Sequence, residues 1–127
     1  MFGPRGLSVV AGAALLVTLV GCGSARQAAL EVKSVNNMKQ IILEAHTYKD
    51  RTGEWPEGLA ALTEQNPGLA PMLKNPITGD DPGYEFVKPT EAEPGADTPL
   101  LYQLRGGQRD ESLGIGYADA SVRKPGQ

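Results

Sequence analysis

The sequence contains a single cysteine and a single histidine among its 127 residues, and aromatic residues make up only 6% of the chain. One cysteine excludes a disulfide bond within the chain, so a small core must be held by packing and hydrogen bonds. The formal net charge is -3, and no basic cluster is present. This pattern argues against nucleic-acid binding and against adhesion to anionic lipid through a polybasic patch. Neither a phosphate loop nor a dinucleotide-binding glycine motif occurs.

Charge is also missing from the start of the chain, since no charged residue lies between Arg5 and Arg26. Residues 7–21 are uncharged and consist mostly of Leu, Val, Ala and Gly. This run has the length of a signal-peptide core and is short for a membrane-spanning helix. It ends in Leu19-Val20-Gly21-Cys22, which places the only cysteine directly after two aliphatic residues and a glycine.

This order of basic start, apolar core and final cysteine resembles the lipobox signal of bacterial lipoproteins. The resemblance implies that residues 1–21 are a signal peptide, cleaved between Gly21 and Cys22, and that Cys22 carries a diacylglyceryl group. Acyl chains such as palmitate would then anchor residues 22–127 to a membrane of the bacterial cell envelope, facing the periplasm or the exterior. Some lipoproteins are retained at the inner membrane by an aspartate directly after the cysteine. Here that position is Gly23, so the outer membrane is an alternative location. The alternative is an uncleaved membrane anchor.

Residues 25–52 show helical spacing of apolar side chains and predict a rod about 40 Å long. The apolar stripe consists of Ala28, Val32, Val35, Met38, Ile42 and Ala45. Ser24 is the candidate N-cap, although Gly23 and Ser24 are equally compatible with a flexible tether. Gly53 and Pro56 end the helix. We expect the N-terminal half to project and the other half to be covered, so that Ala28, Val32 and Val35 face a partner protein.

Three motifs in the rest of the chain resemble pseudopilin-like proteins, in particular a large prepilin-like envelope family of unknown function. The matching segments are Val35-Asn36-Asn37-Met38-Lys39-Gln40-Ile41, Ala45-His46-Thr47-Tyr48 with Gly53-Glu54-Trp55-Pro56, and Ala118-Asp119-Ala120-Ser121-Val122-Arg123. The resemblance implies a pilin-like α+β fold, in which a long N-terminal helix packs on an antiparallel sheet of three or four strands. It also implies an association with a type II secretion-like or surface apparatus.

Two departures from that family bear on function. The family ends with a histidine, nine residues and Asp-Gly, whereas this chain has Arg109 at the histidine position and Ala120 at the glycine position. The glutamate that follows a prepilin peptidase site is absent as well, because residues 6–25 carry no charge. A lipid on Cys22 would replace the apolar half of a pilin helix, so we expect an anchored protein and not a filament.

Downstream of the helix, turn residues alternate with short apolar segments. The pattern predicts a short helix over residues 57–62, a helical turn over 71–74, and strands over 83–87, 100–104, 113–117 and 121–123. Exposed loops are expected over residues 88–98 and 105–111. In the first strand, Tyr84 and Phe86 should share one face and Glu85 the other.

Few residues in the sequence are candidates for a catalytic or specific structural role. His46 lies at the edge of the helical stripe, and we expect it to bond a loop, because no nucleophile or acid motif accompanies it. We expect Trp55 to fill the core and Asp119 to fix a hairpin turn through backbone hydrogen bonds. No residue is assigned to catalysis, so the chain is predicted not to be an enzyme.

A second hypothesis is a calcium- or ligand-binding surface module that uses the acidic loops over residues 80–85 and 91–97. Asp80, Asp81 and Glu85 offer the hard oxygen ligands that Ca²⁺ prefers. Their spacing is not that of an EF-hand. The sequence Asp80-Asp81-Pro82-Gly83 is also typical of an ordinary turn without a metal ion. The first hypothesis, a lipid-anchored envelope protein with a structural or protein-interaction role, requires no cofactor besides the lipid on Cys22.

Overall fold

The computed structural model describes residues 3–126, and it describes the side chains of residues 23–126. The chain forms one long helix, a short helix, two 3-10 helices and five short strands. In chain order these are α1 (Gly3–Thr52), α2 (Leu59–Gln65), η1 (Pro67–Leu73), β1 (Tyr84–Phe86), β2 (Pro99–Arg105), β3 (Gln108–Arg109), η2 (Glu111–Leu113), β4 (Ile115–Tyr117) and β5 (Val122–Arg123).

Helix α1 passes without a break through the region where the sequence predicted its start. Ser24 is therefore neither an N-cap nor part of a tether, and Gly23 does not interrupt the helix. The predicted end is confirmed. Gly53 adopts a φ of 87° and donates its N–H to the Lys49 carbonyl at 2.7 Å, which closes the helix with a left-handed residue.

The strands form an antiparallel sheet in the order β1-β2-β4-β5, and β3 pairs with the far end of β2. Tyr84 is paired with Gln103 across β1 and β2, and Gly116 with Val122 across β4 and β5. The fold is therefore α+β with a long helix on a small antiparallel sheet, as predicted. Strand β3 was not predicted, because it lies in the expected loop of residues 105–111. Gly106 and Gly107 both have positive φ, which gives the tight two-residue hairpin that pairs β3 with β2.

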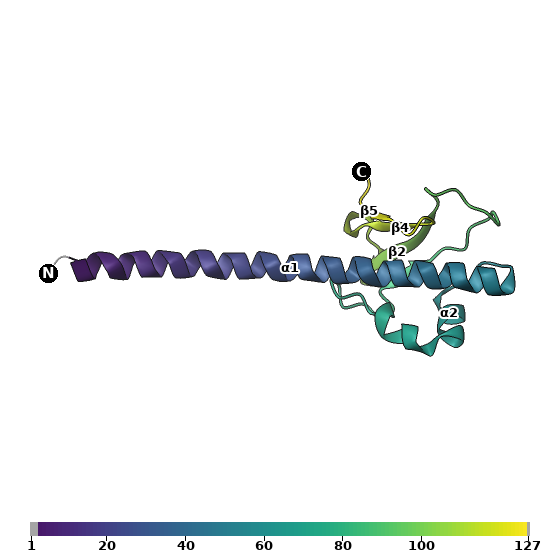
Figure 1. Ribbon diagram of the computed structural model, residues 1–127, viewed down its shortest axis with the longest axis horizontal. Coiled ribbons are helices and arrows are strands. Elements are labelled where there is room, and N and C mark those ends of the chain that lie inside the picture. Colours follow the sequence, from purple (N-terminus) through teal and green to yellow (C-terminus); the bar gives the residue numbers. More distant parts are fainter. Residues whose placement is uncertain (1–2, 127) are drawn as a thin grey trace.

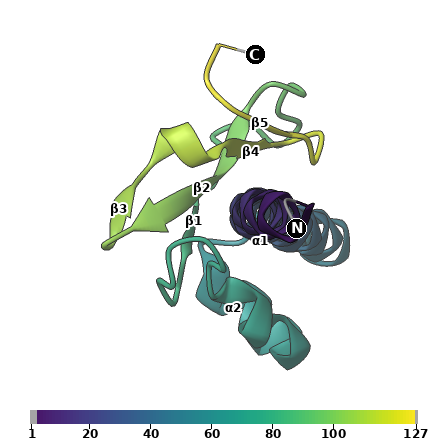
Figure 2. The same cartoon turned by 90° about the vertical axis from the view of Figure 1, so that its left-hand side faces the viewer.

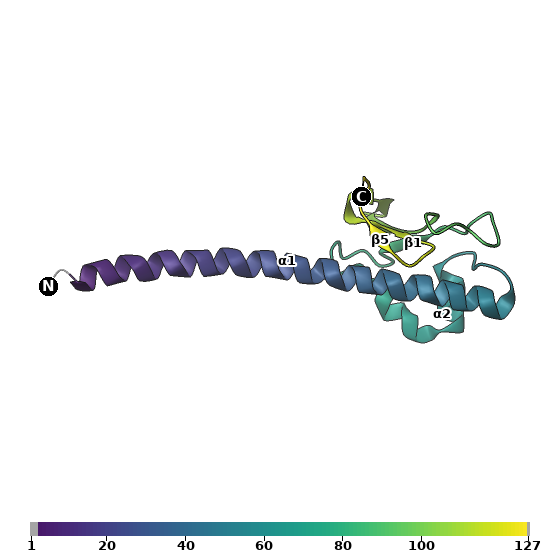
Figure 3. The same ribbon diagram turned by 45° about the horizontal axis from the view of Figure 1, so that its top comes forward.

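The globular part surrounds only the C-terminal half of α1 (Figure 1). Seen along its axis, α1 runs between the sheet on one side and α2 on another (Figure 2). A third view shows the N-terminal part of α1 projecting alone, with no other segment beside it (Figure 3). At 1.5 Å per residue, α1 is a rod of about 75 Å, which is far longer than the domain that covers its end.

The core lies where the inner face of α1 meets the sheet, α2 and η1. Its buried residues are Met38, Ile41, Ile42, Ala45, Trp55, Leu62, Leu69, Tyr84, Phe86, Leu100, Leu101 and Ala118. Helix α2 begins and ends later than predicted. Leu62 is fully buried, whereas Ala60 is exposed. The alternation along β1 is confirmed, since Tyr84 and Phe86 are buried and Glu85 is exposed.

Gly116 of β4 packs against α1 with no room for a side chain. A Cβ on this residue would lie 2.7 Å from Ile42 Cδ1 and 3.3 Å from Leu101 Cβ. We predict that Gly116→Ala lowers the free energy of unfolding by about 1–3 kcal/mol, because the added methyl group overpacks a filled core. Urea denaturation followed by circular dichroism measures this loss.

Gly58→Ala is the matched control, since nothing lies within 4 Å of a Cβ at that position and its φ of -178° is extended. Equal stability of the two variants would contradict the packing described for Gly116.

Candidate functional site

Four polar side chains are buried between α1 and the sheet and form one hydrogen-bonded network. Ser34, Asn75 and Gln103 are at most 1% exposed, and Tyr84 is 1% exposed. Ser34 comes from α1, Asn75 from the segment after η1, Tyr84 from β1 and Gln103 from β2. The network therefore joins four segments of the chain, with Ser34 and Gln103 69 residues apart.

The chemistry of the groups determines the direction of each bond. Ser34 donates its hydroxyl hydrogen to Gln103 Oε1 at 2.7 Å. Because a serine hydroxyl has one hydrogen, the Tyr84 hydroxyl must donate to Ser34 Oγ in their 2.8 Å contact. Asn75 Nδ2 donates to the same Gln103 oxygen at 3.0 Å. Gln103 Nε2 donates in turn to the Leu113 carbonyl at 2.7 Å. Each member is thus satisfied inside the protein, which is the condition for burying polar groups at low cost.

Asn75 also shapes the turn that follows it. Its Oδ1 accepts from the Ile77 N–H at 2.9 Å, and its backbone N–H donates to the Asp80 carbonyl at 2.9 Å. Gly83 packs directly on this turn, since a Cβ there would overlap Asn75. The turn over residues 75–83 is therefore ordered by hydrogen bonds, and the Asn75 side chain anchors it in the core.

A second cluster lies at the C-terminal end of α1 and contains His46 and Trp55, two residues of the motifs identified in the sequence. His46 Nε2 lies 2.7 Å from the Ala118 carbonyl, and because a carbonyl only accepts, Nε2 carries the hydrogen. The His46 ring contacts Trp55 edge-on, with centroids 4.9 Å apart. The expectation that His46 bonds a loop is confirmed. Trp55 is 5% exposed, so its predicted place in the core is also confirmed.

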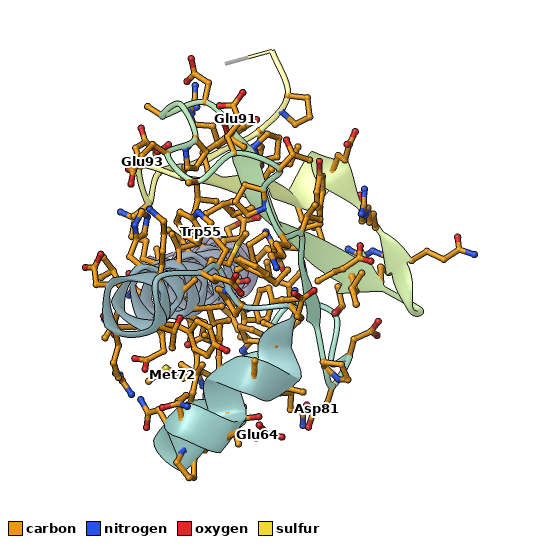
Figure 4. The ribbon with its side chains drawn as sticks, turned by 90° about the vertical axis from the view of Figure 1, so that its right-hand side faces the viewer. Trp55, Glu64, Met72, Asp81, Glu91 and Glu93 are labelled. Carbon is orange, nitrogen blue, oxygen red and sulfur yellow. The ribbon has the colours of Figure 1, made fainter. Side chains whose placement is uncertain are left out.

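Trp55 also holds the acidic loop of residues 88–98 against the helix (Figure 4). Trp55 Nε1 donates to the Ala92 carbonyl at 3.0 Å, and Lys49 pairs with Glu93 at 2.6 Å. The hydrogen bond from Lys49 lowers the pKa of the Glu93 carboxyl below its ordinary value. Lys49 Nζ also lies 5.5 Å from the centroid of the Trp55 ring. Lys49 on α1 and Trp55 just after it thus position a loop for which the sequence alone predicted no contacts.

Asp119 has the structural role that was predicted for it. Its Oδ1 accepts from the Ser121 hydroxyl at 2.6 Å and from the Ser121 N–H at 2.9 Å. These two bonds, the hydroxyl one first, lower the pKa of the Asp119 carboxyl. Ala120, at the position where the resembling family has glycine, adopts a φ of 67°. The turn therefore keeps the left-handed conformation that glycine favours, at some cost in backbone strain.

The acidic residues of the calcium hypothesis do not converge. Asp80 Oδ2 accepts a hydrogen bond from the Gly107 N–H at 2.8 Å. Glu85 forms an ion pair with Arg109, and the hydrogen bond to Glu85 raises the pKa of Arg109. Asp81 lies on the opposite side of the molecule from Glu91 and Glu93 (Figure 4). Among the side chains of residues 23–126, no group of three or more His, Cys, Asp or Glu is placed to hold a metal ion.

The predicted partner-facing stripe is only partly exposed. Ala28 and Val32 are exposed, but Val35 is half-buried and lines a hollow of about 210 Å³ beside Val122 and Arg123. The lipidation and cleavage residues, Cys22 and Gly21, lie outside the residues whose side chains the structure describes. Within the described part of the chain, no helix has the length and apolar character needed to cross a membrane.

Comparison of the chain with protein-family models, with curated proteins and with solved structures gives no match.

The buried network was not predicted, although the sequence holds one signal for it. In β2 the alternation of side chains places Gln103 on the same face as Leu101, which faces the core. A glutamine on a core-facing position predicts a buried hydrogen-bonding partner. Its partners could not be identified in this way, because Ser34 and Asn75 are 69 and 28 residues away along the chain.

Burial raises the pKa of Tyr84, against the opposing effects of its hydrogen bonds with Ser34 and Asn37. The unfolded chain ionises this tyrosine at its ordinary pKa of about 10, whereas the folded protein keeps it protonated at that pH. We therefore predict that the stability is unaffected by Tyr84 below about pH 10 and falls as the pH rises through its folded pKa. Absorbance titration at alkaline pH measures this ionisation as the difference between the wild type and Tyr84→Phe.

The difference between the wild type and Tyr84→Phe should be a titration step above about pH 10, and Tyr102→Phe, which leaves the network intact, should retain this step. A difference step centred at about pH 10 in protein that is still folded would show that the environment described for Tyr84 is wrong.

The relative strength of the two contacts that hold the acidic loop can be predicted from burial. Trp55→Phe removes a buried donor and part of a packed ring, so we expect a loss of about 1–3 kcal/mol in the free energy of unfolding. Lys49→Met keeps the aliphatic stem and removes an ion pair whose Glu93 side chain is 90% exposed, so its cost should be below about 1 kcal/mol. Circular dichroism follows both variants in urea. A larger loss for Lys49→Met would show that the ion pair, and not Trp55, holds the loop.

Proposed function

We propose that this chain is a lipid-anchored protein of the bacterial cell envelope, with a structural or protein-interaction role and no enzymatic activity. The observation that carries the proposal is the order of Arg5, the apolar run of residues 7–21 and Leu19-Val20-Gly21-Cys22, which ends on the only cysteine. Two or three acyl chains on Cys22 would anchor the protein stably, whereas a single chain binds only marginally.

The shape of the molecule is compatible with such an anchor. Helix α1 connects Cys22 to Ser34, which is the first completely buried residue among the side chains of α1 that the structure describes. Twelve residues of helix span about 18 Å, so a lipid on Cys22 would hold the domain at a distance from the membrane surface. The helical segment over residues 23–33 would stand between the two, almost entirely exposed.

A role in protein interaction is supported by this exposed segment, because a single helix that projects into water gains no packing energy from its own domain. The resemblance of the His46, Trp55 and Asp119 motifs to pseudopilin-like proteins supports a setting beside a type II secretion-like or surface apparatus. In the structure these three motifs meet at the end of α1. The calcium-binding alternative gains no comparable support, since Asp80 and Glu85 bond other parts of the protein.

The anchor is tested by expressing the full chain in bacteria supplied with labelled palmitate. We expect the wild type to carry the label and to sediment with membranes, and Cys22→Ala to lose the label, because the thiol that accepts the lipid is gone. Ser24→Ala, two residues away, should keep both properties. Persistence of the label in Cys22→Ala would reject the lipoprotein assignment.

A further inference from the structure

A groove of about 640 Å³ lies where the domain first meets α1. Leu30, Lys33 and Asn37 form its wall on α1, and steps of three and four residues place them on one face of the helix. Met72 of η1 and Lys74, directly after η1, belong to the opposite wall. Met72 is seen beside α1 in Figure 4. The volume is typical of pockets that bind small molecules.

Apolar side chains line part of this groove. Leu30 is half-buried in its wall, whereas residues 23–29 before it on α1 are exposed. Met72 is half-buried on the other side. Pro71 and Pro76 add apolar surface, and their rings fix the backbone φ on both sides of Lys74. The groove can therefore shield an apolar chain from water.

The groove is attached to the buried polar network on both sides. Asn75 lines it and donates a hydrogen bond to Gln103 Oε1 at 3.0 Å. Asn37 lines it from α1 and is hydrogen-bonded to Tyr84. Walls that are already held in place reduce the cost of ordering the protein when a ligand binds.

The charged side chains that line the groove are two lysines, Lys33 and Lys74. Residues 32–43 of α1 and residues 66–79 contain no aspartate or glutamate, although the whole chain has a net charge of -3. Among the residues that the structure describes, ion pairs are formed by other cations, and neither of these two lysines takes part in one.

The carboxylates next to these two segments in the sequence are directed elsewhere. Glu31 lines the hollow beside Val122. Asp80 Oδ2 accepts from the Gly107 N–H at 2.8 Å. Glu44 accepts a hydrogen bond from Asn66 Nδ2 at 3.4 Å. The groove therefore combines an apolar surface with two cations, which is complementary to an amphiphilic anion.

We propose that this groove binds an alkyl or acyl phosphate, a ligand with one apolar chain and a phosphate monoester head. A phosphate monoester carries a charge of about -1.5 to -2 at pH 7, which matches two lysines better than a single carboxylate does. Lys33 and Lys74 would donate charge-assisted hydrogen bonds to the head. The chain would lie against Leu30 and Met72. The proposal does not depend on a lipid at Cys22.

Competitive labelling of lysines with an amine-reactive reagent tests the site in the full chain, held in nanodiscs of phosphatidylcholine and read by mass spectrometry. Saturating octyl phosphate should slow the labelling of Lys33 and Lys74 about tenfold, because the bound head covers both amines. Lys39 is the control, since it is exposed on the same helix but on a different face. No protection, or equal protection of Lys39, would overturn the proposal.

Three further probes separate the parts of the ligand. Inorganic phosphate has the head alone, octanol has the chain without a charge, and octanoate has the same chain with one negative charge. We expect each of them to protect Lys33 and Lys74 less than octyl phosphate does. Protection by inorganic phosphate equal to that by octyl phosphate would overturn the apolar part of the site. Equal protection by octanol or octanoate would overturn the assignment of a phosphate head.

A pair of variants tests whether the two lysines act together. In Lys74→Gln, the concentration of octyl phosphate that half-protects Lys33 should rise about tenfold, because one charged donor is lost. Lys74→Arg keeps the charge and should stay close to the wild type, as should Lys39→Gln outside the groove. Unchanged protection of Lys33 in Lys74→Gln would overturn the proposal.

Discussion

The structure depends on one buried contact, the hydrogen bond from the Ser34 hydroxyl to Gln103 Oε1 at 2.7 Å. It joins the helix to the central strand of the sheet, and Tyr84 and Asn75 bond the same pair. Leaving any one of these groups buried without a hydrogen-bond partner would lower the free energy of unfolding by about 1–3 kcal/mol. A small domain is stable by only about 5–15 kcal/mol, so a sheet displaced from this position along the helix would be strongly disfavoured. Apolar packing alone would define the position less sharply, since Met38, Ile41 and Ile42 are similar in size.

Ser34 consequently divides α1 into two parts with different roles. On its C-terminal side, the helix is the centre of the core. Near its end His46 bonds the Ala118 carbonyl, and Trp55, just after the helix, bonds the acidic loop. On its N-terminal side, the same helix leaves the domain and is almost entirely exposed over residues 23–33. A protein anchored through Cys22 would hold this exposed part close to the membrane. The interaction that stabilises the fold therefore also determines which part of the helix is available to a partner.

Local signals in the sequence were enough for the elements that depend on local physics. The glycine at position 53 predicted the end of α1, and the alternation of Tyr84, Glu85 and Phe86 predicted a strand with one buried face. His46, Trp55 and Asp119 were placed correctly, because each has a single favourable environment at the end of a helix or in a turn. The errors came from competition between signals. Ser24 has the side chain of an N-cap, but α1 continues on both sides of it.

The features that escaped prediction depend on contacts between distant segments. The stripe assigned to a partner included Val35, which the tertiary fold half-buries against β5. The polar network could not be assembled from Gln103 alone, since the identity of its partners is decided by the register between helix and sheet.

Amide hydrogen exchange along α1 of the full chain is the most direct test of this register. If the Ser34 network fixes the sheet on the helix, protection should rise steeply near Ser34, with fast exchange in the exposed segment before it and slow exchange through Ala45. Ser34→Ala should lower the protection of β1 and β2 together with that of the helix. Protection that increases gradually from residue 23, or that is unchanged in Ser34→Ala, would contradict the account.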